Sequence, residues 1–177
     1  MRKIFFLCLL ALPFAFSYSE TSDASELFRL LDAKCFDSSG TLNSACQPLL
    51  DEINSSLDSG KLPDYIFSLF GNKKINLTIK DTGKSYEYFI QTSSKNVDSI
   101  SKGKGTAKMF VETDLETVNE IAYSNDWAGI FVNAIADKRI KYSETGSAEG
   151  AVKTTAFNIF SFFAGMFKGI SSIFGFR

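Results

Sequence analysis

The chain has 177 residues, a formal net charge of −1, no histidine and 18 phenylalanines. Because it has no histidine, the sequence excludes a Ser-His-Asp triad, a Cys-His dyad and imidazole ligands for a metal. The near balance of 19 basic and 20 acidic residues argues against a nucleic-acid partner, which would need a basic patch. The length is typical of one domain with its own core.

The first segment has the features of a secretory signal. Two basic residues precede an apolar stretch, 4–14, that is too short to span a bilayer comfortably. Small residues, Ala15 and Ser17, follow at the positions that a signal peptidase reads. We therefore predict a signal peptide over residues 1–17 and an extracytoplasmic protein, either secreted or in a periplasm-like space. An uncleaved anchor is the alternative.

Cleavage would remove Cys8 and leave Cys35 and Cys46. An even pair of cysteines in an exported chain predicts a disulfide, and two unpaired buried thiols are the alternative. Leucines at helical spacing lie on both sides of a polar turn at 37–40. The segment 18–60 is therefore predicted to be an N-terminal helical hairpin, with one cysteine on each side of its turn.

A short apolar helix, 63–70, is predicted before the spacing of apolar residues changes from 3.6 to 2. The predicted strands are 75–79, 86–90, 97–101, 107–111 and 140–142. Turns at 81–84 and 102–105 contain glycine, and a capping box at 113–116 starts two amphipathic helical segments before the last strand. This order predicts an α+β fold with a five-stranded, mostly antiparallel sheet.

The C-terminal segment 156–177 holds seven of the 18 phenylalanines. On a helix its few polar residues would form one narrow stripe, which predicts an apolar helix in the core or in lipid. Three interpretations stay open. The helix could close the core as a lid, or lie in a membrane interface with Lys168 and Arg177 near headgroups. It could also span the membrane or oligomerise through Gly165 and Gly169.

Three pieces of the middle of the chain carry a resemblance to a known family. Residues 75–84 form a hairpin with an acidic-glycine turn, and residues 107–114 form a strand that runs into an acidic helix cap. Residues 128–146 form a helix, a short basic strand and a glycine. In order and spacing, the chain from about Leu62 to Ala164 resembles the sterol carrier protein 2 family of small lipid-transfer domains.

This resemblance implies that helices cover one face of the sheet, and that an apolar cavity between them takes a sterol, fatty acyl chain or other lipid. The last helix of the family often closes the cavity. We accordingly divide the chain into the signal peptide 1–17, the hairpin 18–60, a lipid-carrier-like core 61–155 and the apolar helix 156–177. The last segment could also contact a membrane surface.

The cavity wall needs apolar and adaptable side chains. The candidates are Met109, Leu115, Val118, Ile121, Trp127, Phe131, Ile135, Phe157, Phe160 and Phe163. Ordinary core packing is the alternative for each of them. Two glycosylation sequons start at Asn54 and Asn76, and Asn54 is the better candidate because Asn76 would lie in a strand.

We find no catalytic residue, cofactor motif or metal-binding cluster in the sequence. Its charged clusters are typical of solvated faces and helix caps, and no pair of carboxylates stands beside a partner nucleophile. The expected function is therefore that of an exported, non-catalytic lipid-binding or carrier protein without a nucleic-acid partner. The alternative is a membrane-associated structural or interaction protein that uses the same fold without a ligand.

Overall fold

The computed structural model describes residues 24–59, 72–93, 96–124 and 126–145. The described helices are α1 (Ala24–Lys34), the short 3-10 helix η1 (Ser44–Cys46), α2 (Gln47–Ser59), α4 (Leu115–Tyr123) and α5 (Trp127–Ala136). The described strands are β1 (Lys74–Asp81), β2 (Lys84–Ser93), β3 (Asn96–Lys102), β4 (Met109–Asp114) and β5 (Lys141–Glu144). The predicted signal peptide 1–17 and the predicted helices 63–70 and 156–177 lie outside the described residues.

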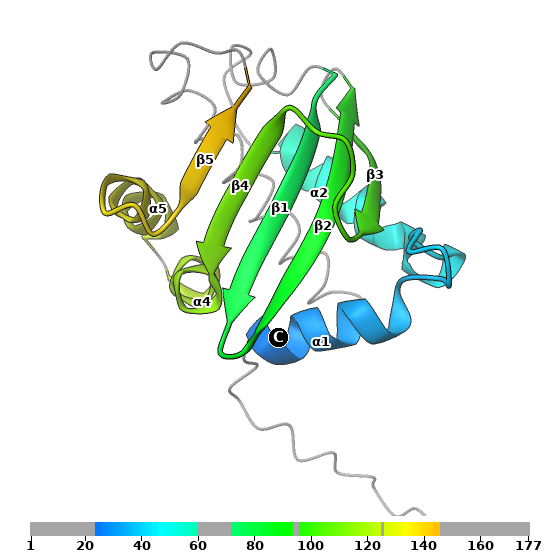
Figure 1. Cartoon of the computed structure of the whole chain (residues 1–177), viewed down its shortest axis with the longest axis horizontal. Helices are drawn as coiled ribbons and strands as arrows, with labels where there is room; N and C mark the ends of the chain where they lie inside the picture. The colour runs from blue at the N-terminus through cyan, green and yellow to red at the C-terminus, as the bar shows by residue number, and fades with distance from the viewer. Residues whose placement is uncertain (1–23, 60–71, 94–95, 125, 146–177) are drawn as a thin grey trace, which may run out of the picture.

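The strands form one sheet in the order β3-β2-β1-β4-β5 (Figure 1). β2 pairs antiparallel with both β1 and β3, and β5 pairs antiparallel with β4. β4 runs parallel to β1. The five-stranded, mostly antiparallel α+β arrangement predicted from the sequence is confirmed, with one parallel pair in its centre.

That parallel pair depends on the connection between β3 and β4. The sequence predicts a tight turn at 102–105, but the connection is longer and places β4 beside β1 and not beside β3. Gly103 has a φ of +88°, which glycine adopts without a Cβ clash, and its N–H donates to the carbonyl of Glu87 at 2.7 Å. The chain then crosses the sheet. The Asn76 amide donates to the carbonyl of Gly105 at 2.8 Å and accepts from its N–H at 2.9 Å. This crossing brings β4 beside β1.

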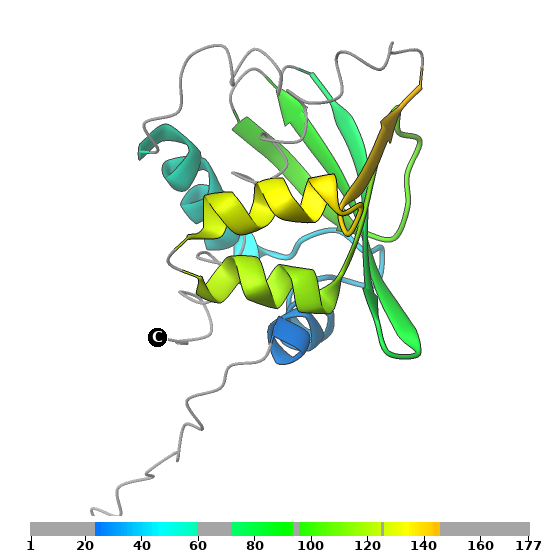
Figure 2. The same ribbon diagram turned by 90° about the vertical axis from the view of Figure 1, so that its left-hand side faces the viewer.

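The sheet has two different faces because its strands alternate buried and more polar residues. Ile75, Leu77 and Ile79 of β1 are buried, and all described helices lie on one side of the sheet (Figure 2). The predicted turn at 81–84 joins β1 to β2 with Gly83 at a φ of +79°. We call the helix-covered side the inner face and the other side the outer face.

The helices contact the inner face from different sides. α1 packs on α4, α2 packs on β3, and α4 packs on β1, β4 and α5. The N-cap of α4 is Asp114, whose carboxylate accepts from the Thr117 N–H at 2.7 Å, one residue beyond the predicted cap at Thr113. Asp126 caps α5 in the same way, accepting from Gly129 at 3.1 Å. The described helices therefore cover a single face of the sheet, as predicted.

The predicted disulfide joins Cys35, next to the end of α1, to Cys46 in η1. Both sulfur-bearing residues are buried. The loop between them also reaches the edge of the sheet, because the Lys102 N–H donates to the carbonyl of Gly40 at 2.8 Å and Thr41 forms a bridge with Ser101. The loop thus covers part of an edge strand that would otherwise expose unpaired backbone groups.

Replacing both cysteines, Cys35→Ala with Cys46→Ala, is expected to lower the free energy of unfolding by about 2–3 kcal/mol. The disulfide spans a sequence separation of 11, and removing it lets the unfolded chain gain loop entropy. Urea denaturation of the wild type with and without reductant measures this loss, and the reduced wild type should match the double variant. Alkylation of both cysteines in native, unreduced protein would show that the bond does not form.

Candidate functional site

The inner face carries an aromatic cluster between α1 and β2. The ring of Phe28 lies 5.3 Å from that of Tyr86 and 6.1 Å from that of Tyr88, centroid to centroid. The ring of Phe36 stacks on that of Tyr88 with a centroid distance of 5.9 Å. Phe28 and Tyr88 are fully buried. These contacts fix α1 on the sheet and close the β2 side of the inner layer.

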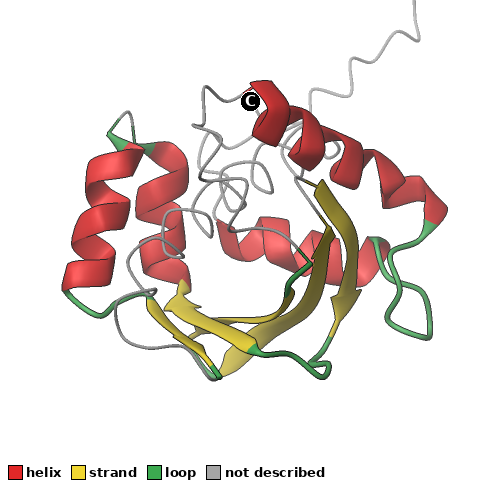
Figure 3. Ribbon diagram, turned by 90° about the horizontal axis from the view of Figure 1, so that it is seen from above, coloured by secondary structure: helices red, strands yellow, loops and turns green. Residues whose placement is uncertain are grey.

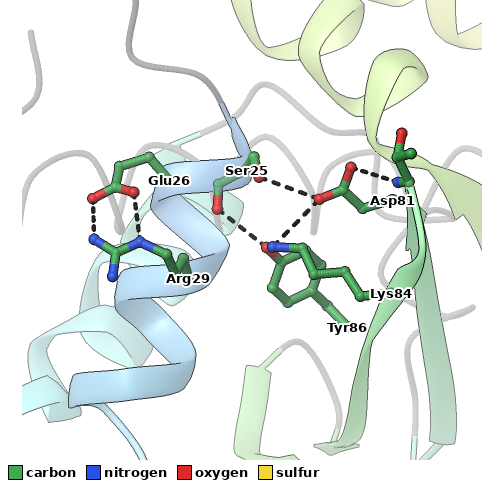
Figure 4. Close-up of polar contacts among 7 residues, drawn as sticks. Ser25, Glu26, Arg29, Asp81, Lys84 and Tyr86 are labelled. Carbon is green, nitrogen blue, oxygen red and sulfur yellow. Dashed lines mark hydrogen bonds and ion pairs between the residues drawn. The ribbon is translucent and has the colours of Figure 1, made fainter.

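The polar ends of the two tyrosines are held by α1. The Tyr88 hydroxyl donates to the Asp32 carboxylate at 2.9 Å, and the Lys102 ammonium lies 2.8 Å from the same carboxylate. Burial and then the negative charge of Asp32 raise the pKa of Tyr88 well above its ordinary value. The Tyr86 hydroxyl donates to the carbonyl of Ser25 at 3.2 Å (Figure 4). Both hydroxyl groups therefore already donate their protons within the fold.

The raised pKa of Tyr88 predicts a loss of stability in alkali. Its phenol stays neutral in the folded chain, whereas the unfolded chain ionises it above about pH 10, so the stability present below that pH is lost as the pH rises. Between pH 10 and pH 11, wild type should lose about 1 kcal/mol more than Tyr88→Phe, because the unfolded phenol is only partly ionised at the start of this range. Urea denaturation of both proteins across this range measures the difference, and identical slopes would contradict the assignment.

Six of the ten candidate wall residues lie on the inner face. Five are buried in one cluster contributed by β4, α4 and α5, and the sixth, Ile135, packs partly buried against it. The five are Met109, Leu115, Val118, Ile121 and Phe131. Trp127 is the first residue of α5, and Phe157, Phe160 and Phe163 lie outside the described residues. Figure 3, a view from above, shows the helices over one side of the sheet. A ligand cavity at these residues stays a prediction.

One polar group on this face is not indicated by the sequence patterns. Thr113 of β4 is 3% exposed, and its hydroxyl has no hydrogen-bond partner, which is true of no other buried side-chain polar atom in the described part of the chain. Its position follows the alternation that buries Met109 and Val111 in the same strand. The alternation with a period of two predicts that Thr113 lies on the inner face. It does not predict that the Thr113 hydroxyl lacks a hydrogen-bond partner.

Thr113→Val is expected to raise the free energy of unfolding by about 1 kcal/mol. The substitution removes a buried hydroxyl that has lost water without gaining a partner. Thr92→Val is the matched control, because the Thr92 hydroxyl is equally buried but accepts from the Lys73 N–H at 3.1 Å. This control should be destabilised by about 1 kcal/mol. Urea denaturation of ligand-free protein decides, and a loss of stability in both variants would contradict the assignment.

The outer face holds a groove of about 320 Å³ beside Phe110, which is 41% exposed. Its charges are compensated. Glu112 lies 2.7 Å from the Lys80 ammonium and 3.5 Å from that of Lys141, and the hydrogen bond from Lys80 lowers the pKa of Glu112. Lys104 lies 2.7 Å from a Glu87 oxygen. This groove is therefore a mixed surface without an unpaired charge among those residues.

A second pocket, of about 640 Å³, lies at the end of the sheet where β1 and β4 begin and β5 ends. Lys73, Lys74 and Lys108 line it together with Glu144. The Lys73 ammonium is 2.5 Å from the Glu144 carboxylate, and both side chains are only partly exposed. We call this pocket the lysine pocket.

Both candidate glycosylation residues are bound within the fold. Asn76 is buried in β1 and holds Gly105 with both ends of its amide. Asn54 of α2 donates to the carbonyl of Val97 at 3.1 Å and accepts from its N–H at 2.8 Å. Asn54 is the more exposed of the two, but a glycan there would have to displace both bonds to the edge strand β3.

The described residues contain neither a membrane-spanning helix nor a metal-binding cluster. No described helix is long and apolar enough to cross a membrane. Within the same residues, no group of three or more histidine, cysteine, aspartate or glutamate side chains could hold a metal ion. The shifted carboxylate pKa values have local causes: the Thr82 N–H is foremost in lowering the pKa of Asp81 (Figure 4), and the Ser39 hydroxyl is foremost for Asp37.

No family model matches the chain, and no curated protein matches it. Among solved structures, a conserved hypothetical protein of Thermus thermophilus, named as "possibly sterol carrier protein", is 12% identical with a TM-score of 0.48. The match covers 72% of this chain and 87% of that one. A crystal structure of sterol carrier protein 2 is 14% identical with a TM-score of 0.45, covering 68% and 93%.

A third similar structure is palmitated SCP2L2 from Aedes aegypti, 17% identical with a TM-score of 0.38, over 63% of this chain and 92% of that one. The solved structures to which the chain is similar therefore include proteins of the sterol carrier protein 2 type, the family that its sequence resembles. At these identities and scores the likeness assigns no ligand to the chain.

Proposed function

We propose that this protein is an exported, non-catalytic lipid-binding or carrier protein that holds an apolar ligand between its sheet and its helices. The observation that carries the proposal is the common location of the candidate wall. Six residues chosen from the sequence come from β4, α4 and α5, and all belong to or pack on one apolar cluster on the inner face. A sterol or an acyl chain needs such a wall of apolar side chains with few polar groups.

The inner face also offers a way to orient an amphiphile. The Thr113 hydroxyl is a buried hydrogen-bonding group without a partner among the described residues, in a largely apolar layer. The two tyrosine hydroxyls are already satisfied by α1. The hydroxyl or carboxyl end of a lipid that reached Thr113 would satisfy this buried group and gain a hydrogen bond away from competing water.

Export is supported by two independent features. The first 17 residues have the order of a signal peptide, and the Cys35–Cys46 disulfide is of a kind that persists in oxidising compartments. A non-catalytic role is supported by the lack of histidine in the chain and by the local turns and ion pairs that account for the shifted carboxylates.

Titration with two fluorescent probes, a polyene fatty acid and a fluorescent sterol, tests the proposal. Delipidated full-length protein should bind at least one of them saturably, and a non-fluorescent lipid of the same class should displace it. Absence of saturable binding by both probes in folded protein would overturn the carrier role. That result would favour the alternative, a membrane-associated structural or interaction protein without a ligand.

A further inference from the structure

The lysine pocket contains two lysines that no described residue neutralises. Lys74 begins β1 and Lys108 directly precedes β4, and the parallel register pairs the next residues along, Ile75 and Met109. Both lysines are exposed and line the same pocket. Neither forms an ion pair with any residue that the structure describes. Other lysines in or next to the strands are paired: Lys73, Lys80 and Lys104, for example, each lie beside a glutamate.

Like charges at neighbouring positions on paired strands destabilise a sheet. The pocket nevertheless places three lysines against one carboxylate, that of Glu144. Thr106 and Thr145 add hydroxyl groups to its lining. Ammonium groups and hydroxyls together are donors for phosphate oxygens. The local chemistry therefore fits an anionic phosphate group that approaches the end of the sheet from outside.

The position of the pocket relates it to the inner face. Each unpaired lysine is followed in the sequence by an inward apolar residue, Lys74 by Ile75 and Lys108 by Met109. Met109 is one of the candidate wall residues. Whatever binds the two lysines therefore lies beside the end of the sheet at which the apolar layer begins.

We propose that the lysine pocket docks the protein on an anionic phospholipid surface, with lipid phosphates between Lys74 and Lys108. The inference rests on the proposed function, because a carrier has to meet a lipid surface to load or release its ligand. The contact surface is then the lysine pocket, and the membrane that the protein selects is negatively charged. Lysines near an anionic membrane each contribute about 1 kcal/mol.

The test is co-sedimentation of the full chain with vesicles of phosphatidylcholine alone or of phosphatidylcholine mixed with phosphatidylglycerol. The double variant Lys74→Gln with Lys108→Gln should bind the anionic vesicles about thirtyfold more weakly than wild type, the equivalent of about 1 kcal/mol for each lysine. On the neutral vesicles, wild type and this double variant should bind equally weakly. Raising the salt should weaken the binding of wild type to anionic vesicles.

The matched control is Lys80→Gln with Lys84→Gln, which removes the same charge at the other end of β1. It should bind anionic vesicles within about twofold of wild type. Equal losses in both double variants would show an effect of net charge, and no loss in the first would exclude the pocket; either result overturns the proposal. Release of the wild type by millimolar inorganic phosphate at constant ionic strength would overturn it too, in favour of a soluble anion.

The docking contact and the carrier role fail separately. In the fluorescent-probe titration, Lys74→Gln with Lys108→Gln should keep the probe affinity of wild type, since both side chains lie outside the apolar layer. Loss of vesicle binding with retained probe binding is the expected combination. Loss of probe binding along with it would contradict the assignment of these lysines to surface docking.

Discussion

Phe28→Ala is expected to lower the free energy of unfolding by about 3–5 kcal/mol, the range for a fully buried aromatic side chain. Phe28 is 0% exposed and joins α1 to the sheet through both Tyr86 and Tyr88. Its removal leaves a cavity in the cluster and loosens the helix that supplies Asp32 to the Tyr88 hydroxyl. Urea denaturation followed by far-ultraviolet circular dichroism measures the loss.

The matched control for Phe28 is its neighbour in the sequence. Arg29 is exposed on the other side of α1, where its guanidinium pairs with the Glu26 carboxylate (Figure 4). Exposed pairs of this kind contribute little to stability, so Arg29→Ala should leave the denaturation midpoint almost unchanged. A small effect of Phe28→Ala, comparable with that of Arg29→Ala, would mean that α1 is not packed on β2 in this way.

Met109→Trp is expected to reduce the protein's capacity for an apolar probe, that is, the amount of probe it binds, at least tenfold. Phe110→Trp should leave this capacity unchanged. The two residues are adjacent in β4 but face opposite sides of the sheet, Met109 at 3% and Phe110 at 41% exposure. A tryptophan at 109 would occupy part of the space assigned to the ligand. Overpacking of this kind lowers the stability of the folded protein by about 1–3 kcal/mol. A ligand that has to share the space with the tryptophan would in addition bind more weakly.

Two further variants keep this prediction decisive. Met109→Leu conserves the volume and should retain probe binding. If Met109→Trp does not fold, Val118→Phe on α4 fills the same apolar layer from the helix side and should reduce the capacity in the same direction. A folded Met109→Trp protein with the probe capacity of wild type would place the ligand elsewhere.

Much of the fold is predictable from local patterns. The alternation in β1 and the acidic-glycine turn after it predict both the hairpin and the inward face, because Gly83 supplies the positive φ that the turn requires. The cysteine pair and the polar turn between the first two helices are predictable in the same way. Such features depend on residues that are close together in the sequence.

The connection from β3 to β4 is not predictable by these means. The segment 102–105 has the chemistry of a hairpin turn, and contacts far apart in the sequence decide that it crosses the sheet. Asn76 holds Gly105 by two hydrogen bonds. A Cβ atom at Gly105 would lie 2.6 Å from ring atoms of Phe89, so the crossing also requires a glycine where the chain passes that ring.

The candidate site divides in the same manner. The spacing of apolar residues places Met109 and the α4 residues on the inner face, since it needs only a period of 2 or 3.6. It cannot place Lys74 beside Lys108, because the parallel register of β1 and β4 brings them together from distant parts of the chain. The unpartnered hydroxyl of Thr113 likewise depends on what every neighbouring element offers it.

The central claim is that this protein carries an apolar ligand on the inner face of its sheet. Native mass spectrometry of full-length protein, purified from its own host by gentle extraction, tests it most directly. We predict a bound species whose added mass is that of a sterol, fatty acid or other lipid. Organic extraction should remove this species and allow its identification. A spectrum that contains only the mass of the bare chain, from protein shown to be folded, would contradict it.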